Sequence, residues 1–99
     1  AVKLAYQDFG FLAEDITQKH LDTFRLQTSK GVVITQIGKK SSAYQVGLEP
    51  GDVIRQVEGI EIADLHDFRR VLLKLSREKR IVFLIQRKNR GYYVTLERQ

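Results

Sequence analysis

The chain has 99 residues, and its shares of hydrophobic residues (42%) and charged residues (29%) are typical of one globular domain. Because it contains no cysteine, it has no disulfide framework, no thiolate zinc site and no cysteine nucleophile. Its size excludes a two-domain enzyme, and its longest apolar run, residues 81–85, is far shorter than the about 20 residues of a membrane helix.

The excess of positive charge, +5 in total, is concentrated in the C-terminal third of the chain. Residues 1–68 contain seven Lys or Arg and ten Asp or Glu, a balance of −3, whereas residues 69–99 contain ten and two, a balance of +8. Such a basic segment either attracts an anionic partner or forms a solvated surface. Both interpretations stay open from the charge alone.

The first elements follow from capping and β-branched residues. Residues 1–7 are interpreted as a linker segment that leads into a domain at residues 8–99. A short helix is predicted to begin after Thr17, which has the side chain of an N-cap residue. A second helix of one or two turns is expected at residues 42–46, capped by Ser41 or Ser42. Segments rich in β-branched residues predict strands at 32–37, 53–57 and 60–62.

The last third predicts one long helix and a hairpin. Asp64 is the expected N-cap of the helix, whose apolar residues recur at helical spacing. These residues are Leu65, Phe68, Val71, Leu72 and Leu75. Residues 81–87 and 92–97 flank a turn in which Asn89 or Gly91 is expected to take a positive φ. Mostly antiparallel strands combined with two or three helices predict an α+β domain or a partly closed β-barrel.

The sequence does not support a catalytic function, because it lacks the residue patterns of a metal site, a serine nucleophile and a phosphate-binding loop. The two histidines, His20 and His66, lie far apart in separate predicted helices, and neither has a partner at metal-ligand spacing. No serine lies in a nucleophile elbow, and no phosphate-binding glycine loop occurs. We therefore expect no catalysis by this chain alone, no cofactor and no metal.

Residues near the C-terminus also suggest binding to nucleic acid. Tyr92 and Tyr93 lie beside Arg87, Lys88 and Arg90, which is a suitable mixture of residue types. However, adjacent tyrosines on a strand face opposite sides, so only one of them can stack on a base from a given surface. The signal is weak, and we expect no binding to nucleic acid.

The segment Phe9-Gly10-Phe11 precedes a predicted strand. A glycine between two aromatic residues lets successive backbone amides point into one space, where they can hold a carboxylate. A strand behind such a loop can pair with an added peptide strand. The alternative is an ordinary turn with two core phenylalanines.

Together with later motifs, this segment resembles a PDZ domain of the bacterial HtrA/Deg (protease Do-like) serine protease family. The most specific motif is Gly47-Leu48-x-Pro50-Gly51-Asp52-Val53-Ile54, followed by Gly59. The resemblance implies an α+β, PDZ-like, partly open antiparallel β-barrel or sandwich. It also implies five to six strands, two main helices and the circularly permuted order of bacterial members.

The resemblance also implies a peptide site, which is carried over onto matching positions. The amides of Phe9, Gly10 and Phe11 are expected to receive a peptide carboxylate, and Phe11, Leu12 and Ala13 to form the pairing strand. Side chains of the long helix are expected to line the groove: Phe68 and Leu72, with Val71 or Leu75 close by. Arg69 and Arg70 are expected at its rim, where they favour acidic peptide residues.

Two positions depart from the family pattern. Asp8 places an anion beside the expected carboxylate loop, which works against a free C-terminus and leaves internal segments open. His66 does not align with the histidine that eukaryotic PDZ domains place at the start of the helix, so a Ser/Thr preference is not carried over.

The function that the resemblance implies is a substrate-recruiting or regulatory module of a periplasmic trypsin-like serine protease in protein quality control. Its partners are expected to be hydrophobic C-terminal or unfolded segments and the protease domain of the same chain. The chain starts at Ala1 without a signal segment, and we expect it to be a piece of a longer protein. The alternative is a non-catalytic docking module of a membrane-associated protease or secretion component.

Overall fold

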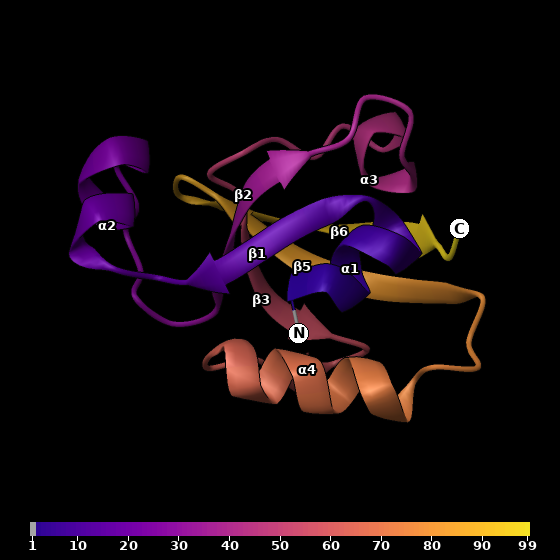
Figure 1. Ribbon diagram of the computed structural model, residues 1–99. Coiled ribbons are helices and arrows are strands. Elements are labelled where there is room, and N and C mark those ends of the chain that lie inside the picture. The colour runs from indigo at the N-terminus through magenta and orange to yellow at the C-terminus, as the bar shows by residue number, and fades with distance from the viewer. Residues whose placement is uncertain (1) are drawn as a thin grey trace.

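The computed structural model describes residues 2–99, with side chains from Ala5 onward, as one sheet with helices around it (Figure 1). The helices are α1 (Val2–Phe9), α2 (Gln18–Phe24), α3 (Ser42–Gln45) and α4 (Leu65–Lys74). The strands are β1 (Phe11–Asp15), β2 (Val32–Ile37), β3 (Val53–Val57), β4 (Ile60–Glu61), β5 (Arg80–Arg87) and β6 (Arg90–Glu97). The predicted α+β class with an antiparallel sheet of six strands is confirmed.

The sheet has the order β1-β2-β3-β5-β6, and β4 pairs with β3 beside this path. All of these pairs are antiparallel. Strand β1 pairs with β2 alone, so its other edge carries no strand of the described chain. The register shifts between Leu12 and Ala13, where β2 carries one extra residue, Thr35, opposite the middle of β1. The sheet therefore has an open edge at the strand that follows Phe9-Gly10-Phe11.

Side-chain capping places the three internal helices where the sequence predicts them. The Oγ1 of Thr17 accepts a hydrogen bond from the amide of His20, and the His20 ring accepts one from the Thr17 amide. Ser41 caps α3 by accepting from the amide of Tyr44. Asp64 caps α4 by accepting from the amide of Asp67.

The hydrophobic core lies between the sheet and helix α4 and contains most of the large apolar side chains. Phe9, Phe11, Phe68 and Phe83 are each at most 1% exposed and form a cluster of neighbouring rings. Ala5 of α1 is also fully buried in this core. Helix α1 is therefore part of the packed structure.

Two features differ from the sequence-based expectation. Residues 1–7 are interpreted as a linker from the sequence, but residues 2–9 form helix α1, whose Ala5 and Phe9 are fully buried in the core. In the β5–β6 hairpin the positive φ (56°) belongs to Lys88, not to Asn89 or Gly91. The pairing of Arg87 with Arg90 explains this, because it leaves Lys88 and Asn89 as the two turn residues.

None of the helices in residues 2–99 has the combination of length and apolarity that crossing a bilayer requires. The described residues also contain no group of three or more His, Asp or Glu side chains arranged to hold a metal ion.

Candidate binding site

Helix α4 lies next to the open edge of β1, and hydrogen bonds fix it at both ends. At one end, the backbone amide of Leu65 donates to the Asp15 carboxylate at the end of β1 (2.7 Å). At the other end, the guanidinium of Arg98 donates to the carbonyl of Leu75 (2.8 Å) and to the carboxylate of Asp8. Strand and helix therefore run antiparallel, side by side along the length of β1.

Between these ends, apolar side chains of β1 and α4 meet along a line that we call the β1–α4 seam. It consists of Phe11 and Ala13 from the strand and Phe68 and Leu72 from the helix. The rings of Phe11 and Phe68 have their centres 6.2 Å apart. All four side chains are at most 1% exposed. The structure thus brings the predicted strand and helix walls together, but their apolar surface is already covered.

The other predicted site residues of this region are divided between the core and the surface. Val71 is buried with the seam, while Leu75 and Leu12 are half-buried. Arg69 and Arg70 are exposed on α4, and Arg70 forms an ion pair with Asp67 at 3.1 Å. Only Arg69 of this predicted rim pair therefore has no ionic partner among the described residues.

The predicted carboxylate loop begins at the end of helix α1. Phe9 is the last helical residue, and Gly10 has a φ of +84°. The amide of Gly10 donates to the carbonyls of Ala5 (3.1 Å) and Tyr6 (2.9 Å). Its carbonyl accepts from the amide of Gly38 at 2.8 Å. The loop therefore has the shape expected of a glycine turn, but the Gly10 amide is used by the helix.

Gly10 also lies against the turn that follows β2. A β-carbon added at Gly10 would overlap the Cβ of Ser41, so no larger residue fits there. A surface pocket of about 290 Å³ opens beside this point, and its lining includes Lys39 and Lys40. Two positive side chains from the turn after β2 therefore line the surface beside the Gly10 loop.

The charge of Asp8 is compensated, which corrects the expectation of a free anion beside the loop. Arg98 pairs with the Asp8 carboxylate, and the two side chains are only 15% and 21% exposed. The same guanidinium donates to the carbonyls of Leu75 and Glu78 and lies 5.2 Å from the centre of the Phe9 ring. Asp8 is thus one partner in a partly buried contact that joins α1 to the C-terminal end of α4.

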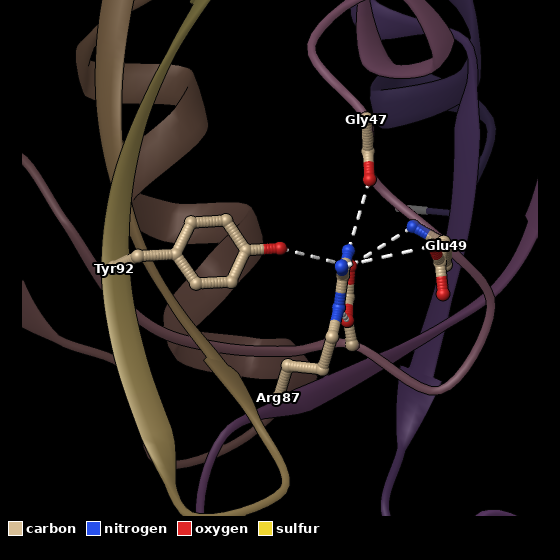
Figure 2. Close-up of polar contacts among 5 residues, drawn as sticks. Gly47, Glu49, Arg87 and Tyr92 are labelled. Carbon is tan, nitrogen blue, oxygen red and sulfur yellow. Dashed lines mark hydrogen bonds and ion pairs between the residues drawn. The ribbon is translucent and has the colours of Figure 1, made fainter.

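A second polar cluster stabilises the turn of the glycine-rich motif. The carboxylate of Asp52, only 1% exposed, accepts from the Glu49 amide (2.9 Å) and from two nitrogens of Arg87 (2.7 and 2.8 Å). Figure 2 shows the Arg87 guanidinium between Tyr92 on one side and Gly47 and Glu49 on the other. By accepting from the Glu49 amide, the Asp52 carboxylate fixes the turn of this motif.

This cluster changes the acidity of Tyr92. Burial, followed by the negative charge of Asp52, raises the pKa of Tyr92 to about 12, although the nearby Arg87 opposes the shift. The hydrogen bond to Asp52 likewise raises the pKa of Arg87 above its ordinary value. The Asp52 carboxylate accepts from Arg87, from the Glu49 amide and from the Tyr92 hydroxyl, and the cluster acts as a structural support for the motif.

Sequence reasoning missed the structural roles of Arg98 and Arg87. Arg98 was counted only within the basic C-terminal third, and Arg87 was named only beside Tyr92 and Tyr93 in a weak nucleic-acid signal. Arg98 meets Asp8 across 90 positions of the chain, and Arg87 meets Asp52 across 35. No local pattern signals either pair, because each depends on how the sheet closes.

The comparisons with known proteins agree with this architecture. The family model described as "PDZ domain" matches residues 10–97. A probable periplasmic serine endoprotease DegP-like of Hahella chejuensis is 36% identical over 53 residues, 54% of this chain and 11% of that protein. The protein of the same name from Marinomonas sp. is 27% identical over 90 residues, 89% of this chain and 19% of that protein. The chain thus spans less than a fifth of the length of these relatives.

The fold is similar to that of the HtrA3 PDZ domain, whose crystal structure contains the phage-derived ligand FGRWV. The TM-score is 0.75 at 20% sequence identity, and the similarity covers 92% of this chain and 83% of that one. The family model, the glycine-rich motif and the fold agree, so the chain belongs to the PDZ domain family.

Proposed function

We propose that this domain binds extended apolar peptide segments, which add as a strand to the open edge of β1 beside helix α4. The observation that carries the proposal is the unpaired edge of β1 next to apolar residues of α4. Backbone hydrogen bonds from such an edge supply affinity, and side-chain contacts with the helix supply selectivity. Peptide binding by the HtrA3 PDZ domain supports the same use of the fold.

In this proposal the residues act in four groups. Phe9, Gly10 and Phe11 form the loop that receives the end of the peptide, and Leu12 and Ala13 continue the pairing strand. Phe68 and Leu72, with Val71 and Leu75, form the apolar side of the site. Arg69 and Arg70 lie at the rim, where they attract acidic peptide residues.

A titration with peptides tests this function directly. The ¹⁵N-labelled chain is mixed with apolar C-terminal and internal peptides while the backbone amide signals are followed by NMR. We expect shifts at residues 9–13 and 65–75 with micromolar dissociation constants, about −8 kcal/mol of binding free energy. Comparing free-acid and C-terminally amidated forms of one peptide measures how much the carboxylate contributes. If no peptide moves the signals of residues 9–13, the proposal is wrong.

We further propose that the domain recruits substrate to, or regulates, a trypsin-like serine protease of the periplasm. The similarity to two proteins named as probable periplasmic DegP-like endoproteases supports this parent and this location. The flanking sequence tests it. A Gly-Asn-Ser-Gly-Gly type of nucleophile segment upstream would support the protease, whereas predicted membrane helices beside the domain would favour the docking module.

A further inference from the structure

Helix α1 lies where the proposed peptide is expected to enter. In Figure 1 it runs between the start of β1 and helix α4, and its chain turns back into β1 at Gly10. Ala5 and Phe9, one helical turn apart, are fully buried in the core cluster that also contains Phe11 and Phe68. The inner face of α1 thus covers apolar surface at the same end of the β1–α4 seam.

Helix α1 also uses the backbone donor that a peptide carboxylate would need. The Gly10 amide is bonded to the carbonyls of Ala5 and Tyr6, at 3.1 and 2.9 Å. An amide has one hydrogen to donate, so it cannot bond a carboxylate while these contacts persist. The loop becomes available only when the last turn of α1 opens.

Two polar contacts join the C-terminal end of α1 to the C-terminal residues of the domain. Arg98 pairs with the Asp8 carboxylate, and the amide of Gln99 donates to the Asp8 carbonyl at 2.7 Å. Because Arg98 also bonds the carbonyl of Leu75, these contacts join α1 to the end of α4. These contacts hold the last turn of α1 against the rest of the domain.

We propose that α1 is an intramolecular gate: in its docked position it closes the peptide site, and peptide binding requires its release. The proposal rests on the proposed function. It explains why all four seam residues are buried in a domain whose binding mode needs them accessible. It also assigns Arg98 as the latch residue, because the Arg98 guanidinium joins the end of α1 to the end of α4.

Such a gate lowers the apparent affinity of the site by the fraction of molecules in which α1 is released. Loosening α1 therefore strengthens peptide binding without adding any contact to the peptide. Gln7 is the position chosen for this change, because its side chain is exposed and lies within the helix. Proline there removes a helical hydrogen bond and clashes with the preceding turn, whereas alanine keeps the helix.

The probe is the pentapeptide Phe-Gly-Arg-Trp-Val with a free carboxylate, the ligand bound to the HtrA3 PDZ domain. The chain itself contains no tryptophan, so the fluorescence of the peptide reports binding without background from the protein. We expect Gln7→Pro to bind this probe about tenfold more tightly than Gln7→Ala and the unmodified chain. Asp8→Asn, which breaks the pair with Arg98 but leaves the helix intact, should shift affinity in the same direction.

Hydrogen exchange provides the second measurement, because it follows α1 without relying on affinity. We expect a saturating amount of the probe to raise exchange at the amides of residues 6–9 in the unmodified chain. The control repeats the exchange measurement with the C-terminally amidated probe. The difference between the two probes shows whether the Gly10 amide is released in order to bind the peptide carboxylate.

The outcomes separate the gate from the proposed function. If the probe binds all variants equally, or binds while residues 6–9 stay protected, the gate is wrong and peptide binding stands. If the probe and the peptides of the titration bind neither the unmodified chain nor Gln7→Pro, peptide binding is wrong and the gate falls with it.

Discussion

Arg98 and Asp8, 90 positions apart, form an ion pair in which both side chains are largely buried. The same guanidinium bonds the carbonyls of Leu75 and Glu78 and stacks over Phe9. One side chain near the C-terminus therefore holds the helix that precedes β1 against the helix that lines the proposed site. The contribution of Arg98 to the free energy of unfolding and its effect on peptide affinity can be measured separately.

Replacing Arg98 with alanine should destabilise the fold by about 2 to 4 kcal/mol, because it leaves a partly buried carboxylate and two carbonyls without their donor. The matched control is Arg80→Ala, since Arg80 pairs with Glu97 while both side chains are largely exposed, 73% and 68%. An exposed pair of this kind is worth about 0 to 1 kcal/mol. Urea denaturation of both variants gives the comparison. Equal losses in the two variants would contradict the role assigned to Arg98.

Gly10→Ala should destabilise the domain by about 3 kcal/mol or more, since a positive φ and a steric overlap act together. The added methyl group meets the Cβ of Ser41. Gly59→Ala is the control that measures the cost of the positive φ without steric overlap. Gly59 has a similar φ of +76°, but no atom lies within 4 Å of an added Cβ. We expect that variant to lose only about 1 kcal/mol. A thermal or urea unfolding series in which Gly59→Ala matches Gly10→Ala would show that packing at Ser41 is unimportant.

The three internal helices and the glycine-rich motif were predictable because their signals are local. Thr17 and Asp64 cap helices through amides three residues away, and Asp52 bonds the amide of Glu49. Capping residues and turn residues therefore mark these structures in the sequence itself. The strands at residues 32–37 and 53–57 followed from the same kind of evidence, as β-branched segments between turns.

The burial of the proposed site residues under helix α1 was not predictable from local signals. Helix α1 spans only two turns, too short for a clear apolar period, and its position depends on the distant Arg98. The same applies to Lys88, which takes a positive φ because of the pairing register of β5 and β6. The proposed site residues come from the family resemblance, whereas their burial comes from packing between elements far apart in the chain.

The polar cluster of Asp52, Arg87 and Tyr92 should lose part of its stabilising effect at high pH. The folded-state pKa is raised to about 12, above the about 10 of an unfolded tyrosine, so the neutral form is favoured by folding. Its contribution is complete below pH 10 and is lost as pH rises towards 12 and beyond. Unfolding curves of the unmodified chain and Tyr92→Phe should therefore converge or cross between pH 10 and 12. Absorbance at the tyrosinate band should show one late-titrating phenol that Tyr92→Phe lacks.

The pH experiment has an internal comparison. Tyr93 on the same strand is 68% exposed, so Tyr93→Phe removes a phenol of ordinary environment. That substitution should leave the late-titrating signal in place. Loss of the late signal in Tyr93→Phe instead of Tyr92→Phe would contradict the effect assigned to burial beside Asp52.

Arg69 tests whether the basic charge of α4 selects peptides. Its side chain is exposed, whereas the neighbouring Arg70 is paired with Asp67, so Arg69 is the stronger candidate for contact with an acidic ligand residue. Arg69→Glu should weaken binding of a peptide that carries Glu upstream of its apolar end by about 3- to 10-fold at low salt, and the difference should shrink as salt is added. Lys19→Glu on α2 makes the same charge change away from α4 and should have a smaller effect. Titrating both variants with the Glu peptide and its Gln counterpart separates local contact from net charge. If the two variants weaken binding equally, the rim assignment of Arg69 is wrong and only the overall charge of the domain acts on the peptide.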